Sequence, residues 1–424
     1  MQYSYPVLLY LYIIIGVALF IIFFWIFVYY DIFSSEKGEK RNRMDPDVAV
    51  IIPTIFEGGF LKTCVDSALK IKYPQDKYKI YVVLNKSADA ATIAAARSFR
   101  DKRVKIIDAP FDGKARVMNY TIQNFVKEEF ILTMDADTIF DKAILVELLS
   151  HADDKNVGAV TPAVKALNVG NWIEFFQEYD YLLSVALRKA FSYIGTLTVA
   201  PGPGSLFRTA IIKKIGYFDE HNKTEDMEIA LRLLSRGYKV ENSLEAVSLT
   251  VVPRTLSSFV KQRVRWYYGF FFNMAKYRKN IFSTKDGRLD ITVFGLIFSS
   301  VALSILVIPT FIYVIWTYAY AFYVTAANTS ILYVMANSLN VNYFLFSFDA
   351  LSVLGLAVLA VGAYMLFYAL HGVKKKFDIK RDVLGLLLYI FVYSYILAFT
   401  WLYAFIQYLF TGKQGSEWKA KIKN

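Results

Sequence analysis

The first 30 residues of the chain carry no charged side chain, and this run constrains the fold more than any other feature. It is longer than the ~20 apolar residues that a helix needs to span a bilayer. It is also too long for a cleaved signal peptide, and it lacks the basic start of one. We therefore predict an N-terminal transmembrane helix over residues 1–30. The overall hydrophobic fraction of 56% fits an integral membrane protein.

The net charge of +12 narrows the classes of partner. In a membrane protein it favours anionic membrane lipid or a polyanionic substrate, and we expect no nucleic-acid partner. Residues 31–45 form a basic linker, which by the positive-inside tendency places this end of the first helix in the cytoplasm. The single cysteine, Cys64, excludes an internal disulfide, and the three scattered histidines show no metal-ligand spacing.

Residues 46 to about 168 alternate between strand-like and helix-like patterns. The strand-like runs are 48–52, 80–84, 104–107, 131–134 and 157–160, and helical periodicity marks 61–69, 90–100, 118–125 and 144–149. Strands that alternate with helices across short turns indicate an α/β fold with a mainly parallel sheet covered by helices. Together with a further strand-like run at 247–252, this pattern predicts one domain over residues 46–257.

Two aromatic-rich stretches have the pattern of amphipathic helices. They cover residues 171–191 and 258–288, and basic side chains follow the aromatic residues in both. A soluble core helix is one interpretation of the first stretch. In a membrane protein we favour helices that lie at the membrane interface.

After residue 289 the chain becomes apolar again. Segments 291–323, 351–370 and 383–410 are each long enough to span a bilayer, so we predict about three C-terminal transmembrane helices over 289–411. The linker before the last segment and the tail 412–424 are both basic, although they flank one span. The positive-inside tendency cannot hold at both of its ends, so the C-terminal topology stays open.

Two acidic residues follow the apolar run 131–134 at once, and they suggest a metal site. Asp135 and Asp137 are two positions apart, so as strand residues they would point to the same face. Ligands of open α/β sheets collect beyond the carboxyl ends of the strands, and paired carboxylates there suit a hard divalent cation. The alternative is a charged turn that ends a strand.

Four other polar groups are candidates for chemistry. Thr224-Glu225-Asp226 precedes a helical pattern, where Thr224 would be an N-cap or Asp226 a general base. Gln262, Arg265 and Trp266 share one side of a predicted helix, where they would bind sugar and phosphate or sit at headgroup depth. Lys114 starts a predicted helix and would meet a diphosphate there, and Asp89 would bind a nucleotide or cap the next helix.

In their order and spacing these residues resemble the membrane-embedded family 2 glycosyltransferases of GT-A fold. Members include hyaluronan, chitin, cellulose and poly-N-acetylglucosamine synthases. The resemblance runs from about residue 48 to 270, and the Thr-Glu-Asp and Gln-x-x-Arg-Trp signatures are its most specific part. Looser matches are Val50–Thr54 with Glu57, Asp89, Lys114 with Arg116 and Asn119, and Gly202–Ser205 with Arg208.

The resemblance implies a GT-A (Rossmann-like) domain in the cytoplasm and a metal-dependent, inverting transfer of a sugar from a UDP-sugar donor. Asp137 and Asp135 would hold Mg²⁺ or Mn²⁺, and Asp226 would be the general base. The donor would be bound by Thr54, Glu57, Asp89, Lys114, Asp135 and Arg265, and the acceptor by Trp266, Gln262, Gly204 and Glu225.

The resemblance implies a multi-pass protein of the cell membrane. It leaves the choice between two acceptors open. One is a growing polysaccharide exported through the protein's own transmembrane channel, and the other is a polyprenyl phosphate or similar lipid that takes a single sugar. A channel or transporter with a regulatory domain is a third interpretation, but the C-terminal spans carry almost no ionisable residue besides Asp349. One departure is Asn85, which stands where the second strand usually ends in an acid and leaves base recognition open.

Overall fold

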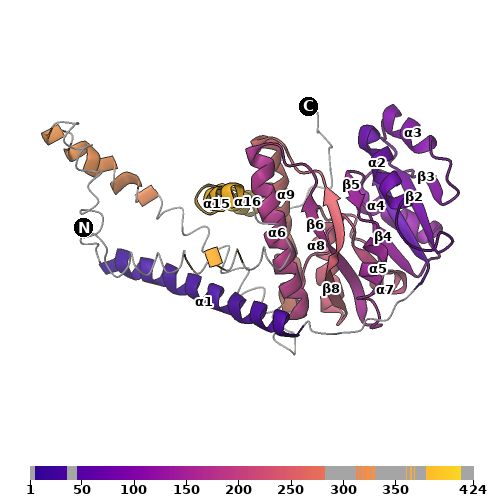
Figure 1. The fold of residues 1–424 in the computed structure, drawn as a ribbon, viewed down its shortest axis with the longest axis horizontal. Coiled ribbons are helices and arrows are strands. Elements are labelled where there is room, and N and C mark those ends of the chain that lie inside the picture. Colours follow the sequence, from indigo (N-terminus) through magenta and orange to yellow (C-terminus); the bar gives the residue numbers. More distant parts are fainter. Residues whose placement is uncertain are drawn as a thin grey trace.

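The computed structural model describes residues 5–35, 45–281 and 379–411, with short pieces between 312 and 367. The long helix α1 (Tyr5–Ser35) leads into an α/β domain, and α15 (Ile379–Leu388), the π-helix η2 (Tyr389–Tyr393) and α16 (Ser394–Thr411) follow it (Figure 1). Helix α1 ends at Ser35, five residues past the predicted end at residue 30.

The described domain is built on one eight-stranded sheet with the order β3-β2-β1-β4-β7-β6-β8-β5. Strands β1 to β4 pair with one another in parallel, as predicted, but β7 is antiparallel to both β4 and β6, and β5 is antiparallel to β8. The sheet is therefore mixed rather than mainly parallel. The strands are β1 (Val48–Thr54), β2 (Tyr78–Leu84), β3 (Val104–Asp108), β4 (Phe130–Thr133), β5 (Thr138–Phe140), β6 (Val157–Ala166), β7 (Leu206–Arg208) and β8 (Lys239–Thr250).

Both faces of the sheet are buried, and β1 shows why. Its side chains alternate between two apolar clusters: Val48, Val50 and Ile52 belong to one, and Ala49 and Ile51 to the other. The first cluster includes residues of α2 (Gly58–Leu69), α3 (Ala90–Arg97) and α5 (Ile144–Leu149). The second includes residues of α4 (Lys114–Asn124), α7 (Thr209–Ile215) and α8 (Glu225–Ser235). Continuous apolar strands such as β1 are typical of a sheet covered on both sides.

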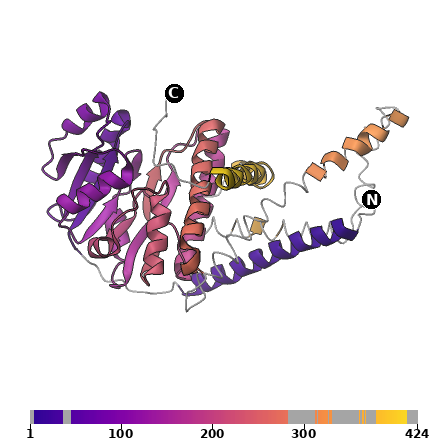
Figure 2. The same cartoon turned by 180° about the vertical axis from the view of Figure 1, so that it is seen from behind.

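The two predicted amphipathic stretches form α6 (Trp172–Tyr193) and α9 (Leu256–Ile281), which lie side by side along one flank of the domain (Figures 1 and 2). Helix α6 begins with a capping box between Asn171 and Glu174. An ion pair of 2.6 Å between Asp180 and Arg263 joins the two helices. The same flank holds the C-terminal helices, because Tyr267 of α9 stacks on Trp401 of α16 with ring centroids 3.8 Å apart.

Two described helices are long and apolar enough to cross a membrane, judged by length and composition. They are Leu8–Val28 within α1 and Ser394–Thr411, which is α16. The predicted spans 291–323 and 351–370 fall mostly outside the described residues, as do most of the linker 31–45 and the tail 412–424.

Candidate functional site

The acidic pair lies at the carboxyl end of β4, as the sequence suggests. Strand β4 ends at Thr133, so Asp135 and Asp137 occupy the turn before β5 and not the strand itself. Asp137 accepts hydrogen bonds from the hydroxyls of Thr250 at 3.3 Å and Thr138 at 3.4 Å. Burial, with the nearby charge of Asp135, raises the pKa of Asp137 to about 6. The turn thus holds two carboxylates that repel each other.

This donor set fits a divalent cation that shares its coordination with a phosphate. Within the described residues no group of three His, Cys, Asp or Glu side chains is placed to hold a metal. Magnesium-type sites on phosphate substrates commonly use one or two carboxylates, with substrate oxygens and water as the other ligands. A cation between Asp135 and Asp137 would also relieve the repulsion that raises the pKa of Asp137.

Lys114 connects the acidic pair to the start of α8. Its Nζ lies 2.6 Å from Asp135 Oδ1 and 3.2 Å from Glu225 Oε1. Burial alone would lower the pKa of Lys114, but the charges of Asp135 and Glu225 outweigh burial and raise it. Two residues that the sequence assigned to separate ligands, Lys114 to the donor and Glu225 to the acceptor, therefore meet in one network of ion pairs.

Asp226 belongs to the same network. It follows Glu225 in the first turn of α8, and its Oδ1 accepts a hydrogen bond of 2.8 Å from the Met227 backbone. Burial and the charge of Glu225 raise the pKa of Asp226 to about 6, while Lys114 and Arg265 act in the opposite direction. The predicted base therefore lies within electrostatic range of the lysine that binds Asp135.

Thr224 is the N-cap residue of α8 and acidic residues occupy the first turn, as the alternative expects, but the Thr224 side chain makes no capping hydrogen bond. Its hydroxyl instead donates to Asn222 at 3.1 Å and accepts from Asn273 of α9 at 3.0 Å. All three side chains are buried. The Thr-Glu-Asp segment is thereby fixed to the helix that carries the Gln-x-x-Arg-Trp segment.

The Gln-x-x-Arg-Trp segment lies in the middle of α9. Arg265 is exposed and its charge acts on Asp226. The guanidinium of Arg263 lies 4.3 Å from the centroid of the Trp266 ring, and Arg263 is itself held by Asp180. Gln262 Oε1 is buried and has no hydrogen-bond partner among the described residues. Sequence reasoning missed Arg263, although it stands within the motif.

Tyr181 of α6 lies near Arg263 of α9. Its ring centroid is 6.0 Å from the Arg263 guanidinium. Burial raises the pKa of Tyr181 to about 12, with contributions from the charges of Asp180 and Asp137. Helix α6, which the sequence analysis placed only at the interface, therefore borders the candidate site.

The predicted nucleotide residues of the first two strands make local contacts. Thr54 is buried and donates to the Val83 carbonyl at 3.2 Å, and Glu57 accepts from the Ile55 backbone at 2.7 Å. Asp89 is exposed and caps α3 by accepting from the Thr92 backbone at 3.0 Å. Among these three residues, Glu57 lies near enough to the acidic pair for its charge to raise the pKa of Asp137.

The unexpected Asn85 has a structural role. Its buried amide donates to the Thr54 carbonyl at 2.7 Å and accepts from the Gly113 backbone at 2.9 Å. Gly113 directly precedes Lys114 and has φ +107°, which favours glycine. Asn85 therefore ties the end of β1 to the loop that positions Lys114. An ionised carboxylate could accept from Gly113 but could not donate to Thr54.

The two glycines of the 202–205 segment differ in their surroundings. Gly204 has φ +103°, and a Cβ there would lie 3.1 Å from both Phe140 and Pro162, so it packs against the core. A Cβ on Gly202 would lie 2.3 Å from Lys114 Nζ and 2.9 Å from Asp135 Oδ2. Gly202 therefore lies directly against the ion pair, a contact that the sequence analysis did not assign to it.

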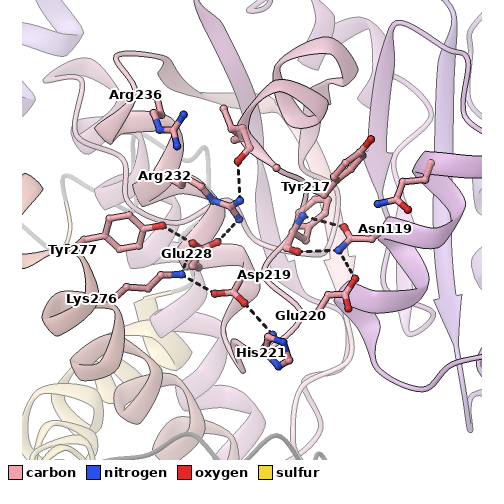
Figure 3. A pocket seen from close by; sticks show the side chains of 14 residues that line it. Asn119, Tyr217, Asp219, Glu220, His221, Glu228, Arg232, Arg236, Lys276 and Tyr277 are labelled. Carbon is pink, nitrogen blue, oxygen red and sulfur yellow. Dashed lines mark hydrogen bonds and ion pairs between the residues drawn. The ribbon is translucent and has the colours of Figure 1, made fainter.

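A pocket of about 550 Å³ lies beside α8 and α9, and Figure 3 shows its lining. Glu228, 1% exposed, accepts from Arg232 at 2.5 Å, from Lys276 at 2.8 Å and from the Tyr277 hydroxyl. Lys276 also pairs with Asp219 at 2.7 Å. Asn119, one of the looser matches in sequence, lines this pocket, but none of the residues predicted to bind metal, donor or acceptor does. Because these charges neutralise one another, we assign no ligand to it.

The α/β part of the chain matches a known protein family. The model of that family, glycosyltransferase like family 2, covers residues 46–269. A poly-beta-1,6-N-acetyl-D-glucosamine synthase of Staphylococcus epidermidis is 24% identical over 264 residues, which cover 59% of this chain and 63% of that protein. An N-acetylglucosaminyltransferase of Rhizobium meliloti is 27% identical over 248 residues, which cover 55% of this chain and 57% of that protein. The chain thus spans less than two thirds of the length of either relative.

A solved structure supports the fold independently. The mannosyltransferase PcManGT from Pyrobaculum calidifontis, solved with GDP-Man and Mn²⁺, superimposes with a TM-score of 0.53 at 19% identity. The match covers 83% of this chain and 99% of that one. The mixed α/β sheet is consistent with the GT-A fold that the resemblance implied. Because the family model spans more than half of the sequence, the chain belongs to the glycosyltransferase like family 2.

Proposed function

We propose that this protein is a membrane-integrated, inverting glycosyltransferase that takes a nucleotide-diphosphate sugar, with a UDP-sugar as first candidate, and elongates a polysaccharide at the cytoplasmic face. The observation that carries the proposal is the bridge from Asp135 through Lys114 to Glu225, with distances of 2.6 and 3.2 Å. This bridge joins the residues proposed for donor binding to those proposed for the acceptor. Such proximity is the first requirement of a transfer reaction.

Asp226 would be the general base. As the acceptor oxygen attacks the anomeric carbon of the donor, the acceptor hydroxyl loses its proton to the Asp226 carboxylate. The bond from that carbon to the diphosphate breaks on the opposite face, so the configuration inverts and the nucleoside diphosphate leaves. A pKa of about 6 suits the role, because the carboxylate is mostly ionised at neutral pH yet more basic than an ordinary aspartate.

Asp137 and Asp135 would hold Mg²⁺ or Mn²⁺, which when bound neutralises the diphosphate as it leaves. Lys114 and Arg265 would add positive charge near the phosphates. Thr54, Glu57 and Asp89 would shape the nucleotide end of the site from β1, the start of α2 and the start of α3.

Trp266 would hold the acceptor sugar against its ring, since indole faces are flat and apolar. Gln262 supports this assignment, because its buried and unpartnered Oε1 is free to accept from a sugar hydroxyl. Glu225 and Gly204 would complete the acceptor side. Helices α6 and α9 would seat the domain at the membrane, and α1 with the C-terminal helices would form the channel that exports the product.

The names of the relatives give a choice of sugar to test first. Both act on or polymerise N-acetylglucosamine by name, so UDP-N-acetylglucosamine heads the set of donors. The test incubates purified full-length protein with Mn²⁺ and a panel of radiolabelled UDP-sugars, then measures the size of the labelled product. A long polymer is expected. If the product is a lipid that carries a single sugar, the protein is the lipid-directed transferase and not a polymerase. If no donor gives any transfer, the proposal is overturned.

A further inference from the structure

Arg188 of α6 is half-buried, and one edge of its guanidinium has no partner among the described residues. Its Nε and Nη2 atoms are both buried, and neither has a hydrogen-bond partner in the part of the chain that the structure describes. Burying an uncompensated charge costs several kcal/mol, so arginines in such positions usually pair with a carboxylate or a ligand. The ligand-free protein thus carries a guanidinium whose binding capacity is unused.

Arg263 provides an internal comparison. Its Nε and Nη2 are buried and make no hydrogen bond of good geometry either, but Asp180 lies 2.6 Å from its Nη2 in an ion pair, and the pKa of Arg263 is raised because neighbouring charges outweigh burial. For Arg188 the effect of burial on the pKa outweighs that of the neighbouring charges. Burial lowers its pKa to about 10, and the opposing charges of Tyr181, Asp180 and Asp226 are too weak to compensate. No carboxylate forms an ion pair with Arg188 among the described residues.

The surroundings of Arg188 place it at the candidate site. Asp226, the proposed base, acts on its charge, and so does Tyr181. Tyr181 lies seven residues earlier on α6, which is two helical turns along the same side, and it senses the charge of Asp137 as well. Arg188 is therefore within electrostatic range of the acceptor end of the site, on a helix whose Tyr181 is within electrostatic range of Asp137.

We propose that Arg188 binds a phosphate group of a substrate of this enzyme, an inference that rests on the proposed function and deepens it. Nε and Nη2 form one edge of the guanidinium, and their two N–H bonds match two oxygens of a phosphate. The phosphate has two sources. It is either the diphosphate of the donor or the phosphate of a polyprenyl-phosphate acceptor.

The test measures binding with purified full-length protein in detergent. Titration calorimetry in the presence of Mn²⁺ gives the affinity for UDP, for uridine and for undecaprenyl phosphate, each for wild type, Arg188→Gln and Arg236→Gln. Arg236 is the matched control because it is an exposed arginine at the end of α8, outside the site. Thermal unfolding of the ligand-free proteins is measured in parallel.

We expect Arg188→Gln to weaken binding of one phosphate ligand by about 10- to 100-fold, as the loss of charge-assisted hydrogen bonds does, and to leave uridine unaffected. A loss confined to UDP assigns the donor diphosphate, and a loss confined to undecaprenyl phosphate assigns the acceptor. The ligand-free variant should melt at or above the wild-type temperature, because it loses an unpaired buried charge. Arg236→Gln should change neither the affinity for the phosphate ligands nor the melting temperature.

Two results would overturn the inference. One is wild-type affinity of Arg188→Gln for both phosphate ligands while wild type binds at least one of them, which leaves the proposed function standing. The other is a variant that melts at a lower temperature and loses uridine binding too, since that describes a structural arginine. If wild type binds no phosphate ligand at all, the proposed function fails together with the inference.

Discussion

Gly269 of α9 lies directly against Thr224, which immediately precedes α8, so closely that a Cβ at position 269 would be 2.3 Å from Thr224 Oγ1 and 2.4 Å from its Cγ2. One helical turn further along α9, the buried Asn273 donates to the same hydroxyl at 3.0 Å. Thr224 precedes the proposed base by two residues. The distance between α8 and α9 therefore sets where Asp226 lies relative to the Gln-x-x-Arg-Trp segment.

Gly269→Ala should separate the two helices. We expect a loss of about 1–3 kcal/mol of stability, as is usual for overpacking, and at least a tenfold loss of transferase activity because Asp226 shifts. Thermal unfolding and sugar transfer are measured on the same preparation. Gly59→Ala in α2 is the matched control, because a Cβ there meets nothing within 4 Å and alanine favours the helix. Wild-type stability and activity of Gly269→Ala would show that this contact is not needed.

The sequence predicts most of this fold, because long periodic elements carry strong signals. The continuous apolar residues of β1, for example, indicate a strand buried on both faces, and the structure confirms it. Strands β5 and β7 escape prediction because each has only three residues, which is too short for periodicity. These two strands, with β8, turn a parallel sheet into a mixed one.

The candidate site was predictable where a motif is continuous in sequence, and less so where a contact joins distant segments. Asp135, Asp137 and Asp226 carry recognisable spacing. The bridge from Lys114 to Glu225 joins positions 111 residues apart, and no local pattern encodes it. Arg188 reads as an ordinary basic residue near the end of a helix. Only packing reveals that its Nε and Nη2 are buried and have no partner among the described residues.

Gly202→Ala tests the site without disturbing the core. The new Cβ would lie 2.3 Å from Lys114 Nζ, which ends a flexible side chain, so the lysine should move away from Asp135. We expect a melting temperature close to wild type but an affinity for UDP with Mn²⁺ that is lower by about tenfold, as the loss of one charge-assisted contact predicts. Titration calorimetry measures this affinity, and thermal unfolding measures the melting temperature.

Gly158→Ala serves as the contrasting variant for this test. Its Cβ would meet Leu233 Cδ2 in the core at 2.6 Å, so it should lower the melting temperature and leave the affinity for UDP unchanged. If Gly202→Ala lowered stability and kept full affinity, the assignment of Gly202 to the binding site would be wrong.

Asn85→Asp replaces a side chain that both donates and accepts with one that, when ionised, only accepts. The carboxylate would face the Thr54 carbonyl, which lies 2.7 Å from Asn85 Nδ2. We expect a loss of about 1–3 kcal/mol at pH 7.5 in denaturant titration. The loss should shrink near pH 5, where a protonated carboxyl can donate again. The exposed Asn124→Asp is the control and should change little; an equal effect of both variants would contradict the role given to Asn85.

Asp226→Asn separates catalysis from stability. The raised pKa of Asp226, about 6, means that the folded protein holds a proton between about pH 4 and 6 that the unfolded chain has released. The contribution of this group to stability is therefore present at low pH and is lost as the pH rises through 6. Asparagine is neutral throughout. The variant should melt at or above the wild-type temperature at pH 7.5, and the difference should shrink as the pH falls through 6 and vanish below about pH 4.

The same variant should lose sugar transfer by about 10²- to 10⁴-fold while it still binds UDP, because a general base contributes about that much. Wild-type activity should fall below pH 6 as the carboxylate takes up its proton. Comparing the melting temperatures of wild type and variant at each pH isolates Asp226 from Asp137, which both proteins share. Asp76→Asn, at an exposed acid far from these contacts in sequence, is the control and should retain activity. Full activity of Asp226→Asn would leave the proposed chemistry without its base.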